Sequence, residues 1–413
     1  MIVLIEIFQD WYVNTTDNDL LYWGLDYPPL TAYHSYMMGM VGNQINSSYV
    51  ELHNSRGIQT HLHKLFMRLT VIVSDILILF PPIFLFSNKN YLTPVTILSY
   101  PGLVLIDHGH FQYNNISLGL FLAAVAFILR ERLLVGSVLF VCALNYKQME
   151  LYHALPFFFY LLAICARKRT YGSKLAQLIK IGLTVLVTFG VIWSPFIVIG
   201  KESVLQVVLR IFPFSRGLFE DKVSNFWCAL DVVMKLKQKM PVEDLAKICL
   251  GATFGLSLPS NIHLLFNPSG KNFLLSLVNT SLVFFLFSFQ VHEKSILLAA
   301  IPVSLLTFID LDDSVSTVIP WFLTISTFSM LPLLIKDGLL IPTISLSIMF
   351  LTIIANMDQF APAKNKYEKR TQSPVPVRPP TSFHTFLKIC MFLSLLGCVT
   401  LVLLSTTYPP PSK

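Results

Sequence analysis

The sequence contains little charge for its size. Only 13% of its 413 residues are Asp, Glu, Lys or Arg, whereas roughly 25% is typical of soluble globular domains. Hydrophobic residues make up 54% of the chain, and the mean hydropathy is +0.64. This composition excludes an ordinary water-soluble domain and predicts an integral membrane protein. The net charge of +7 lies in short loops between apolar runs, so it indicates membrane orientation and not a nucleic-acid-binding surface.

The six cysteines form no recognisable pattern. The sequence has no CxxC pair and no Cys/His spacing typical of a zinc site. We therefore expect these side chains to pack as ordinary apolar groups, and we expect no bound metal and no cofactor. The apolar runs also lack the strict alternation of a transmembrane β-barrel, so they predict α-helices.

Long apolar runs predict an all-α, polytopic membrane protein with about twelve spanning helices. We divide the chain into a lumenal N-terminal segment, residues 1–65, and a transmembrane domain, residues 66–413. The stretch 223–236 raises the alternative of a further span, but its charged side chains favour a lumenal or re-entrant segment. The expected spans are 66–86, 92–106, 115–129, 133–144, 154–166, 177–199, 248–266, 272–289, 296–309, 317–335, 339–355 and 384–407.

Basic residues set the predicted orientation. The loop 167–176 and the Pro- and Lys-rich linker 356–383 carry many Lys and Arg residues, which predicts a cytosolic position for both. The alternate segments, including the long loop 200–247, then lie on the lumenal side. Two glycosylation acceptor patterns, at Asn14 and Asn46, also fall on that side, which agrees with this orientation.

Four motifs between the apolar runs have the composition of a chemical site, and helix parity predicts that all four share the lumenal face. The first motif, residues 22–33, surrounds Asp26 and Tyr27 with aromatic side chains and contains a diproline. Aromatic rings can stack on the apolar faces of sugars while a carboxylate binds their hydroxyls. We therefore interpret Asp26 as a candidate catalytic residue and Tyr27 as a candidate substrate-binding residue. The alternative is an aromatic belt at the membrane interface.

The second motif, residues 107–110, combines a carboxylate with two imidazoles where an expected span ends. Such a group could bind a phosphate or a metal, or transfer a proton. Since no partner cluster for a metal occurs elsewhere, we interpret Asp107 as a candidate catalytic residue and His108 and His110 as substrate-binding residues. The alternative is a set of polar side chains at a membrane exit.

Further cations are candidates for binding an anionic substrate. Lys147 lies at an expected helix end, and Arg216 lies in the third motif, where it could pair with a phosphate. The fourth motif supplies His292 and Lys294. The alternatives are a snorkelling lysine, a solvated interfacial helix and a short charged turn. Asp75, inside the first expected span, is a functional candidate or a partner of another helix.

In this order, the motifs resemble one family, the dolichyl-phosphate-glucose-dependent glucosyltransferases of the endoplasmic reticulum. The resemblance runs from about Trp11 to the C-terminus. The variants of two motifs resemble the members that add the first glucose and not those that add the second. The segments that carry the resemblance are 22–33, 107–114, 145–152, 212–223 and 291–295.

The resemblance implies a GT-C type enzyme in the membrane of the endoplasmic reticulum, with its active site facing the lumen. The implied donor is dolichyl-phosphate glucose, and the implied acceptor is Man9GlcNAc2 on dolichyl diphosphate. Transfer would invert the anomeric centre and form an α-1,3 linkage. The resemblance implies that Asp26 binds or activates the acceptor. It also places His108, Arg216, His292 and Lys294 around the lipid phosphate.

Two alternatives to an active glucosyltransferase stay open at this point. Intramembrane Asp and His residues also serve secondary transporters, although the inverted repeats typical of transporters are not detected here. The second alternative is an inactive form. Family members have a further N-terminal helix and an acidic segment before the block that begins at Trp11, and one more C-terminal helix. These differences from the family would leave a shortened form with little or no activity.

Overall fold

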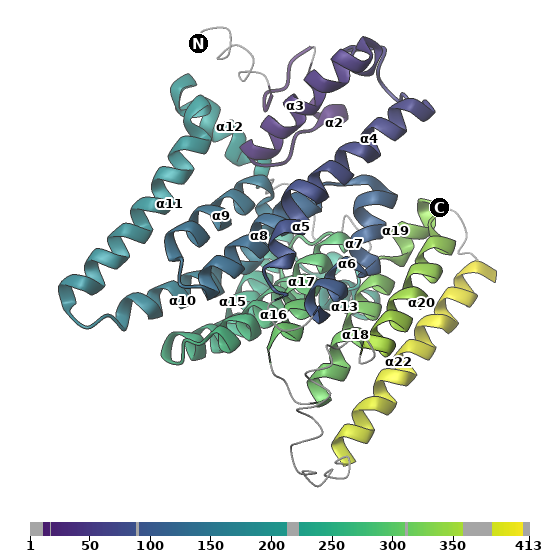
Figure 1. Cartoon of the computed structure of the whole chain (residues 1–413). Coiled ribbons are helices and arrows are strands. Elements are labelled where there is room, and N and C mark those ends of the chain that lie inside the picture. The colour runs from purple at the N-terminus through teal and green to yellow at the C-terminus, as the bar shows by residue number, and fades with distance from the viewer. Residues whose placement is uncertain are drawn as a thin grey trace.

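The computed structural model describes residues 11–16, 18–87, 91–212, 223–309, 313–357 and 382–407. These residues form helices joined by short connections, with no strand among them (Figure 1). The predicted all-α class is therefore confirmed for this part of the chain. The α-helices are α2 (Leu20–Trp23), α3 (Pro29–Ile45), α4 (His61–Ser74), α5 (Phe80–Phe84), α6 (Leu92–Leu98), α7 (Pro101–Val104), α8 (Asn114–Leu129), α9 (Leu133–Tyr146), α10 (Ala154–Ala166), α11 (Tyr171–Ile199), α12 (Lys201–Ile211), α13 (Phe226–Met234), α14 (Leu236–Lys239), α15 (Val242–Phe266), α16 (Gly270–Phe287), α17 (Leu297–Leu305), α18 (Asp313–Ser329), α19 (Leu331–Lys336), α20 (Leu340–Asn356) and α22 (Ser382–Thr407).

Two apolar helices, α8 and α17, form the centre of the molecule (Figure 1). Phe121 and Leu122 on α8 are fully buried, and every residue of α17 is buried. Residues of α9, α10 and α16 belong to the same hydrophobic cluster. A helix that is apolar on all sides is stable only when other elements surround it. These two helices therefore provide the fixed frame on which the polar segments are placed.

The helices α11 and α22 lie on opposite outer edges of the molecule (Figure 1). Both expose large apolar side chains, for example Leu186 at 70%, Val191 at 68% and Phe392 at 66%. Such faces are expected to contact lipid. Six helices among the described residues are long and apolar enough to cross a membrane: His61–Phe84, Gln148–Ala166, Tyr171–Ile199, Val242–Phe266, Gly270–Phe287 and Thr385–Leu404.

Two expected spans differ from regular α-helices. The expected span 66–86 overlaps one continuous helix, His61–Phe84, whose middle residues Asp75–Leu79 form a π-helix. The expected span 92–106 is broken. Its α6 and α7 meet at Pro101, and a second π-helix, Leu105–Phe111, extends it. Proline lacks a backbone N–H and is accommodated at the first position of a helix, which explains the break at this point.

A short helix, α13, occupies most of the stretch 223–236. It has nine residues and is followed by Lys235, which has a left-handed backbone with φ 48°. A helix of this length extends about 14 Å, less than half of a bilayer core. The lumenal or re-entrant position of 223–236 stays a prediction.

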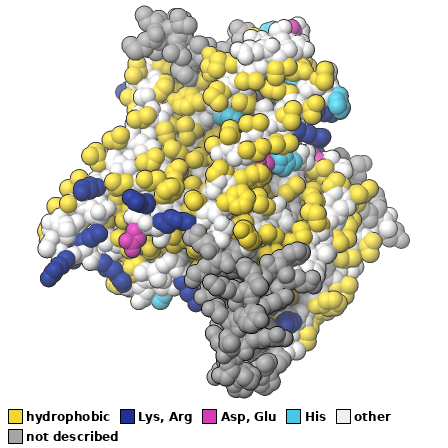
Figure 2. Space-filling view, in the orientation of Figure 1, with side chains coloured by type: hydrophobic (Ala, Val, Ile, Leu, Met, Phe, Trp, Pro, Cys, Tyr) yellow, Lys and Arg dark blue, Asp and Glu magenta, His cyan; other side chains and the backbone are white. Residues whose placement is uncertain are grey.

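Lys and Arg side chains gather at one end of the molecule, over the loop between α10 and α11 (Figure 2). Arg167, Lys168 and Arg169 in this loop are exposed. Hydrophobic side chains cover much of the surface between this basic end and the end formed by α3 and α12 (Figure 2). The basic loop is thus well separated from the first sequence motif, which runs into α3.

Candidate active site

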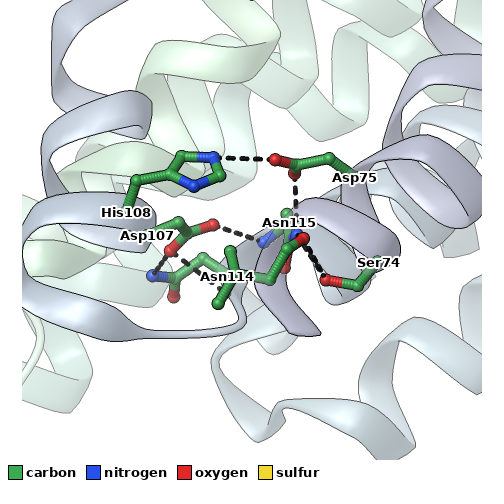
Figure 3. A network of polar contacts seen from close by, with 7 residues as sticks. Ser74, Asp75, Asp107, His108, Asn114 and Asn115 are labelled. Carbon is green, nitrogen blue, oxygen red and sulfur yellow. Dashed lines mark hydrogen bonds and ion pairs between the residues drawn. The ribbon is translucent and has the colours of Figure 1, made fainter. Parts of the chain in front are cut away.

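The two π-helices meet at a buried carboxylate (Figure 3). Asp75, 6% exposed, begins one π-helix, and His108 lies in the other. The Nε2 atom of His108 lies 2.7 Å from Oδ2 of Asp75. The side-chain amide of Asn115 donates hydrogen bonds to Oδ1 of Asp75 and to the hydroxyl of Ser74, each at 2.7 Å. A π-turn inserts an extra residue and is frequent at functional sites.

Asp107 caps helix α8. Its carboxylate accepts hydrogen bonds from the backbone N–H of Asn114 at 3.2 Å and of Asn115 at 2.7 Å, and from the Asn114 side chain at 2.7 Å (Figure 3). The first N–H groups of a helix lack partners within it and favour a negative charge. Asp107 is only 1% exposed. The carboxylate is thus buried against the helix that it caps, and the catalytic role of Asp107 stays a prediction.

Lys147 connects two of the sequence motifs. Its ammonium group donates a hydrogen bond to the side-chain oxygen of Asn114, at the end of the second motif. The same ammonium nitrogen lies 5.6 Å from the centre of the Tyr27 ring, in the first motif, within the range of a cation–π contact. Helix α9 ends at Tyr146, so the extended backbone of Lys147 lets its side chain reach both neighbours. The predicted binding residues Lys147 and Tyr27 are therefore adjacent.

Asp26 forms an ion pair with Arg210 of α12, with 2.5 Å between Oδ1 and Nη2. The Gln148 side chain donates one hydrogen bond to the backbone carbonyl of Asp26 at 2.8 Å and a longer one, 3.4 Å, to that of Ile211. Both side chains of the ion pair are about one quarter exposed, at 26% for Asp26 and 23% for Arg210. The candidate catalytic Asp26 is thus held between α12 and the segment that supplies Lys147.

His110 connects the second and fourth motifs. Its Nδ1 lies 2.6 Å from a carboxylate oxygen of Asp337, and its Nε2 lies 3.4 Å from the ammonium nitrogen of Lys294. His292, in the same motif as Lys294, is exposed. The predicted binding residues His110 and Lys294 are therefore together. Arg216, predicted in the third motif, lies outside the described residues.

Burial and neighbouring charges shift the pKa values of several groups in this region. Burial raises the pKa of Asp107 to about 7, against its hydrogen bonds to Asn114 and Asn115 and the charge of Lys147. Burial lowers the pKa of Lys147 to about 8, against the nearby carboxylates. The hydrogen bond to Asp75 raises the pKa of His108 above its ordinary value, more than burial lowers it. Perturbed ionisation of this kind is frequent at functional sites.

The π-helix that carries Asp107, His108 and His110 ends in a strained residue. Phe111 has φ 75°, a left-handed conformation that is unfavourable for a bulky side chain. Its ring packs edge-on against that of Tyr113, with 5.4 Å between the centroids. Strain of about 1–3 kcal/mol at a residue of this kind persists only where the surrounding structure imposes it. The region combines strain, buried charge and cations, which is typical of a site for an anionic substrate.

Comparison with known proteins agrees with this chemistry. The sequence profile of the ALG6, ALG8 glycosyltransferase family matches residues 6–413. The chain belongs to this family. It is 46% identical over 98% of its length to a chicken protein (Gallus gallus) named dolichyl pyrophosphate Man9GlcNAc2 alpha-1,3-glucosyltransferase, of which it covers 81%. Identity is 47% to the mouse protein (Mus musculus) of the same name and 44% to a probable one from Drosophila melanogaster, with 98% of this chain and 81% and 82% of those proteins covered.

Within this family member, several residues of the region were not among the predicted site residues. Arg210, Gln148 and Asp337 are ordinary polar residues in the sequence, and their partners lie far away along the chain. Asn115 lies in the first turn of an apolar helix, and nothing in the sequence distinguished it as a site residue. Asp75 did carry a signal, because a carboxylate inside an apolar run is costly unless it has partners.

Proposed function

We propose that this chain transfers glucose from dolichyl-phosphate glucose to Man9GlcNAc2 on dolichyl diphosphate, with inversion, forming an α-1,3 linkage. Family membership and the names of the relatives support the reaction and the acceptor. Among the observations of the structure, the position of Lys147 carries the proposal. This cation contacts both the motif rich in aromatic residues and the motif rich in histidines, so one side chain joins a region suited to sugars with a region suited to phosphate.

The cations of the site bind the donor's phosphate in this proposal. Lys147, His108, His110 and Lys294 are the proposed contacts of this phosphate. His292 and Arg216 are proposed to add to the same field. In glycosyl transfer, the bond between the sugar carbon and the phosphate oxygen breaks, and its electron pair stays on the phosphate. Cations placed where this charge develops stabilise the transition state more than the ground state.

The acceptor is proposed to lie against the first motif. Tyr27 offers an aromatic face to a sugar, and Asp26 binds or activates an acceptor hydroxyl. Asp107 positions this site by capping α8 at Asn114, the residue that Lys147 contacts. In an inverting transfer, the acceptor oxygen attacks from the face opposite the leaving phosphate. The acceptor hydroxyl loses its proton to a base within hydrogen-bond reach.

We also propose the finer topology, with about twelve crossings in the membrane of the endoplasmic reticulum and the site facing the lumen. The six long apolar helices support part of this arrangement, and the four shorter apolar helices are consistent with further crossings. Single cysteines provide the test. Substitutions His108→Cys and His292→Cys should be labelled only from the lumen, and Lys168→Cys only from the cytosol. Labelling of His292→Cys from the cytosol alone would overturn the topology.

Expression in cells that lack the first glucosyltransferase tests the reaction itself. The expected product is lipid-linked oligosaccharide with one glucose added to Man9GlcNAc2, detected by chromatography of the released glycan. The matched controls are Lys147→Ala, which should not restore the product, and Lys168→Ala, which should. Failure of the unsubstituted chain to add glucose, or addition only to an acceptor that already carries glucose, would contradict the proposed reaction.

A further inference from the structure

Asp75 is a buried carboxylate within a helix long and apolar enough to cross the membrane. An intramembrane charge is costly, by about 2.5–3.5 kcal/mol on insertion scales, unless partners compensate. Here each oxygen has a partner from the second motif or from the helix that follows it. Oδ2 faces Nε2 of His108, and Oδ1 accepts a hydrogen bond from Asn115 (Figure 3). The two oxygens of this carboxylate therefore contact residues of two other helical segments, and neither of these contacts is within its own helix.

The backbone around Asp75 is fixed by a close helix approach. A Cβ added at Gly119 of α8 would lie 2.5 Å from the carbonyl oxygen of Ile78, three residues after Asp75. Real side chains do not approach a carbonyl this closely, so only glycine permits the contact. Since Asn115 belongs to the same helix as Gly119, the position of Asp75 relative to α8 is determined by backbone packing as well as by its hydrogen bonds.

The geometry leaves one ring nitrogen of His108 available to another partner. Asp75 occupies Nε2, and the His108 side chain remains 32% exposed. Within the described part of the chain, no residue forms a hydrogen bond with its Nδ1. A carboxylate on one ring nitrogen fixes the orientation of an imidazole and favours its protonated form, which then presents an N–H donor at the opposite nitrogen.

We propose that Asp75 is a positioning residue that keeps His108 as an imidazolium, with its Nδ1–H available to the phosphate of the lipid-linked sugar donor. This inference rests on the proposed function. When the bond from sugar to phosphate breaks and its electron pair remains on the phosphate oxygen, the imidazolium donates a hydrogen bond to the new charge. No proton needs to leave His108, because the acceptor's proton goes to a separate base.

The charges around His108 agree with this role. Its hydrogen bond to Asp75 is the largest influence that raises its pKa, and the charge of Asp107, on the same π-helix, acts in the same direction. On the packed helix α4, Arg68 is exposed. His110 faces Asp337 and Lys294 instead. Among the described residues, Asp75 is thus the only carboxylate from another element that forms an ion pair with His108.

The substitution Asp75→Asn removes the negative charge and keeps the size of the side chain. Its amide oxygen can still accept the hydrogen bond from Asn115. In purified full chain, this variant should raise the KM for dolichyl-phosphate glucose about tenfold on the alkaline side of the pH profile and leave the KM for the oligosaccharide acceptor unchanged. The alkaline limb of kcat/KM should shift to lower pH, because His108 loses its proton more readily. Asp75→Glu, which keeps the charge, should hold the limb near its original position.

A double-mutant cycle with His108→Gln tests whether Asp75 acts through His108. If Asp75 acts through His108, Asp75→Asn should cause no further loss of rate in the His108→Gln background. Multiplication of the two losses would overturn the positioning role while leaving the proposed function intact. A normal rate for His108→Gln alone would instead contradict the proposed phosphate-binding role of His108.

A measurement on the unsubstituted protein covers the case in which Asp75→Asn does not fold. Diethylpyrocarbonate modifies neutral imidazole, so mass spectrometry of labelled protein across a pH series follows the protonation of His108. The expected midpoint lies above the ordinary value of 6.5. A midpoint at or below that value would overturn the proposal.

Discussion

Two acid–imidazole pairs in this molecule have the same separation and different surroundings. His108 and Asp75 lie 2.7 Å apart, as do His153 and Glu150. The His108 side chain is 32% exposed, whereas both side chains of the second pair are fully buried. His153 also uses its second nitrogen, because Nε2 contacts the carbonyl oxygen of Leu298 at 2.7 Å.

This difference shows that contact with an acid does not by itself determine the role of a histidine. The ring of His153 stacks on Phe121 at 4.0 Å and has both nitrogens engaged, so it can only support packing between α8, α17 and the segment before α10. In His108 only Nε2 contacts an acid, and the side chain is partly exposed. We therefore assign a structural role to the buried pair and propose a substrate-directed role for the partly exposed one.

The largest expected effect is on stability, at the buried pair. Removing Glu150 leaves His153 without its acidic partner in a region closed to water, which costs about 3–5 kcal/mol when a buried pair is broken. We expect Glu150→Ala to lower the thermal unfolding midpoint of the detergent-purified protein markedly. The control Glu150→Gln keeps a hydrogen-bonding side chain and should lose less. An unfolding midpoint of Glu150→Ala equal to that of the unsubstituted chain would contradict the structural assignment.

The second largest effect is expected at Lys147. It compares a cation of the candidate site with a cation of the exposed basic loop. Lys147→Ala removes a cation from the position where negative charge is proposed to develop, so transfer should fall on the order of a hundredfold. Lys168→Ala, in the exposed basic loop, should retain the original rate. The measurement is glucose transfer by equal amounts of folded protein. Equal losses in the two variants would show that general charge, and not position, matters.

A smaller effect is expected for the fourth motif. His292→Ala and Lys294→Ala should each lower transfer tenfold or more, on the order of 1.4 kcal/mol of activation free energy. Both should raise the KM for the donor more than that for the acceptor, because the lost cations bind phosphate. Steady-state kinetics with varied donor and acceptor distinguish these effects. An effect confined to the acceptor KM would assign the motif to the oligosaccharide.

The smallest effect is a dependence on pH. Asp107 caps α8 as a carboxylate, so the cap weakens as pH falls through its pKa of about 7. Lys147 loses its charge as pH rises through its pKa of about 8. Transfer should therefore be fastest between these values and fall on both sides. Lys147→Arg stays charged and should remove the contribution of Lys147 to the alkaline side, which leaves only the loss of the His108 proton there. An unchanged alkaline side in Lys147→Arg would assign that limb to another group, such as His108.

The overall class and the grouping of the motifs could be predicted from the sequence, because both depend on local patterns. Apolar run length indicated helices, and loop parity placed the motifs of Lys147 and Tyr27 on one face. The structure shows these two residues in contact. The two π-helices could not be predicted, since a one-residue shift in the phase of the hydrophobic pattern cannot be recognised within an apolar run.

The roles of individual acids also required the structure. Asp107 and Asp26 look equivalent in sequence, as acids beside aromatic and imidazole groups. In the structure, Asp107 is buried beneath α8, whereas Asp26 is partly exposed and paired with Arg210. Such pairing joins residues nearly two hundred positions apart, and a single sequence contains no information on which distant residue completes an ion pair.

The most direct test compares His108→Gln with His153→Gln in two readouts, the unfolding midpoint and the rate of glucose transfer per folded molecule. We predict that His108→Gln lowers the rate at least tenfold, on the order of 1.4 kcal/mol of activation free energy, with an unchanged midpoint. His153→Gln should lower the midpoint and leave the rate per folded molecule near its original value. The reverse pattern, with normal transfer by His108→Gln and a lost rate in folded His153→Gln, would contradict the assignment of the site.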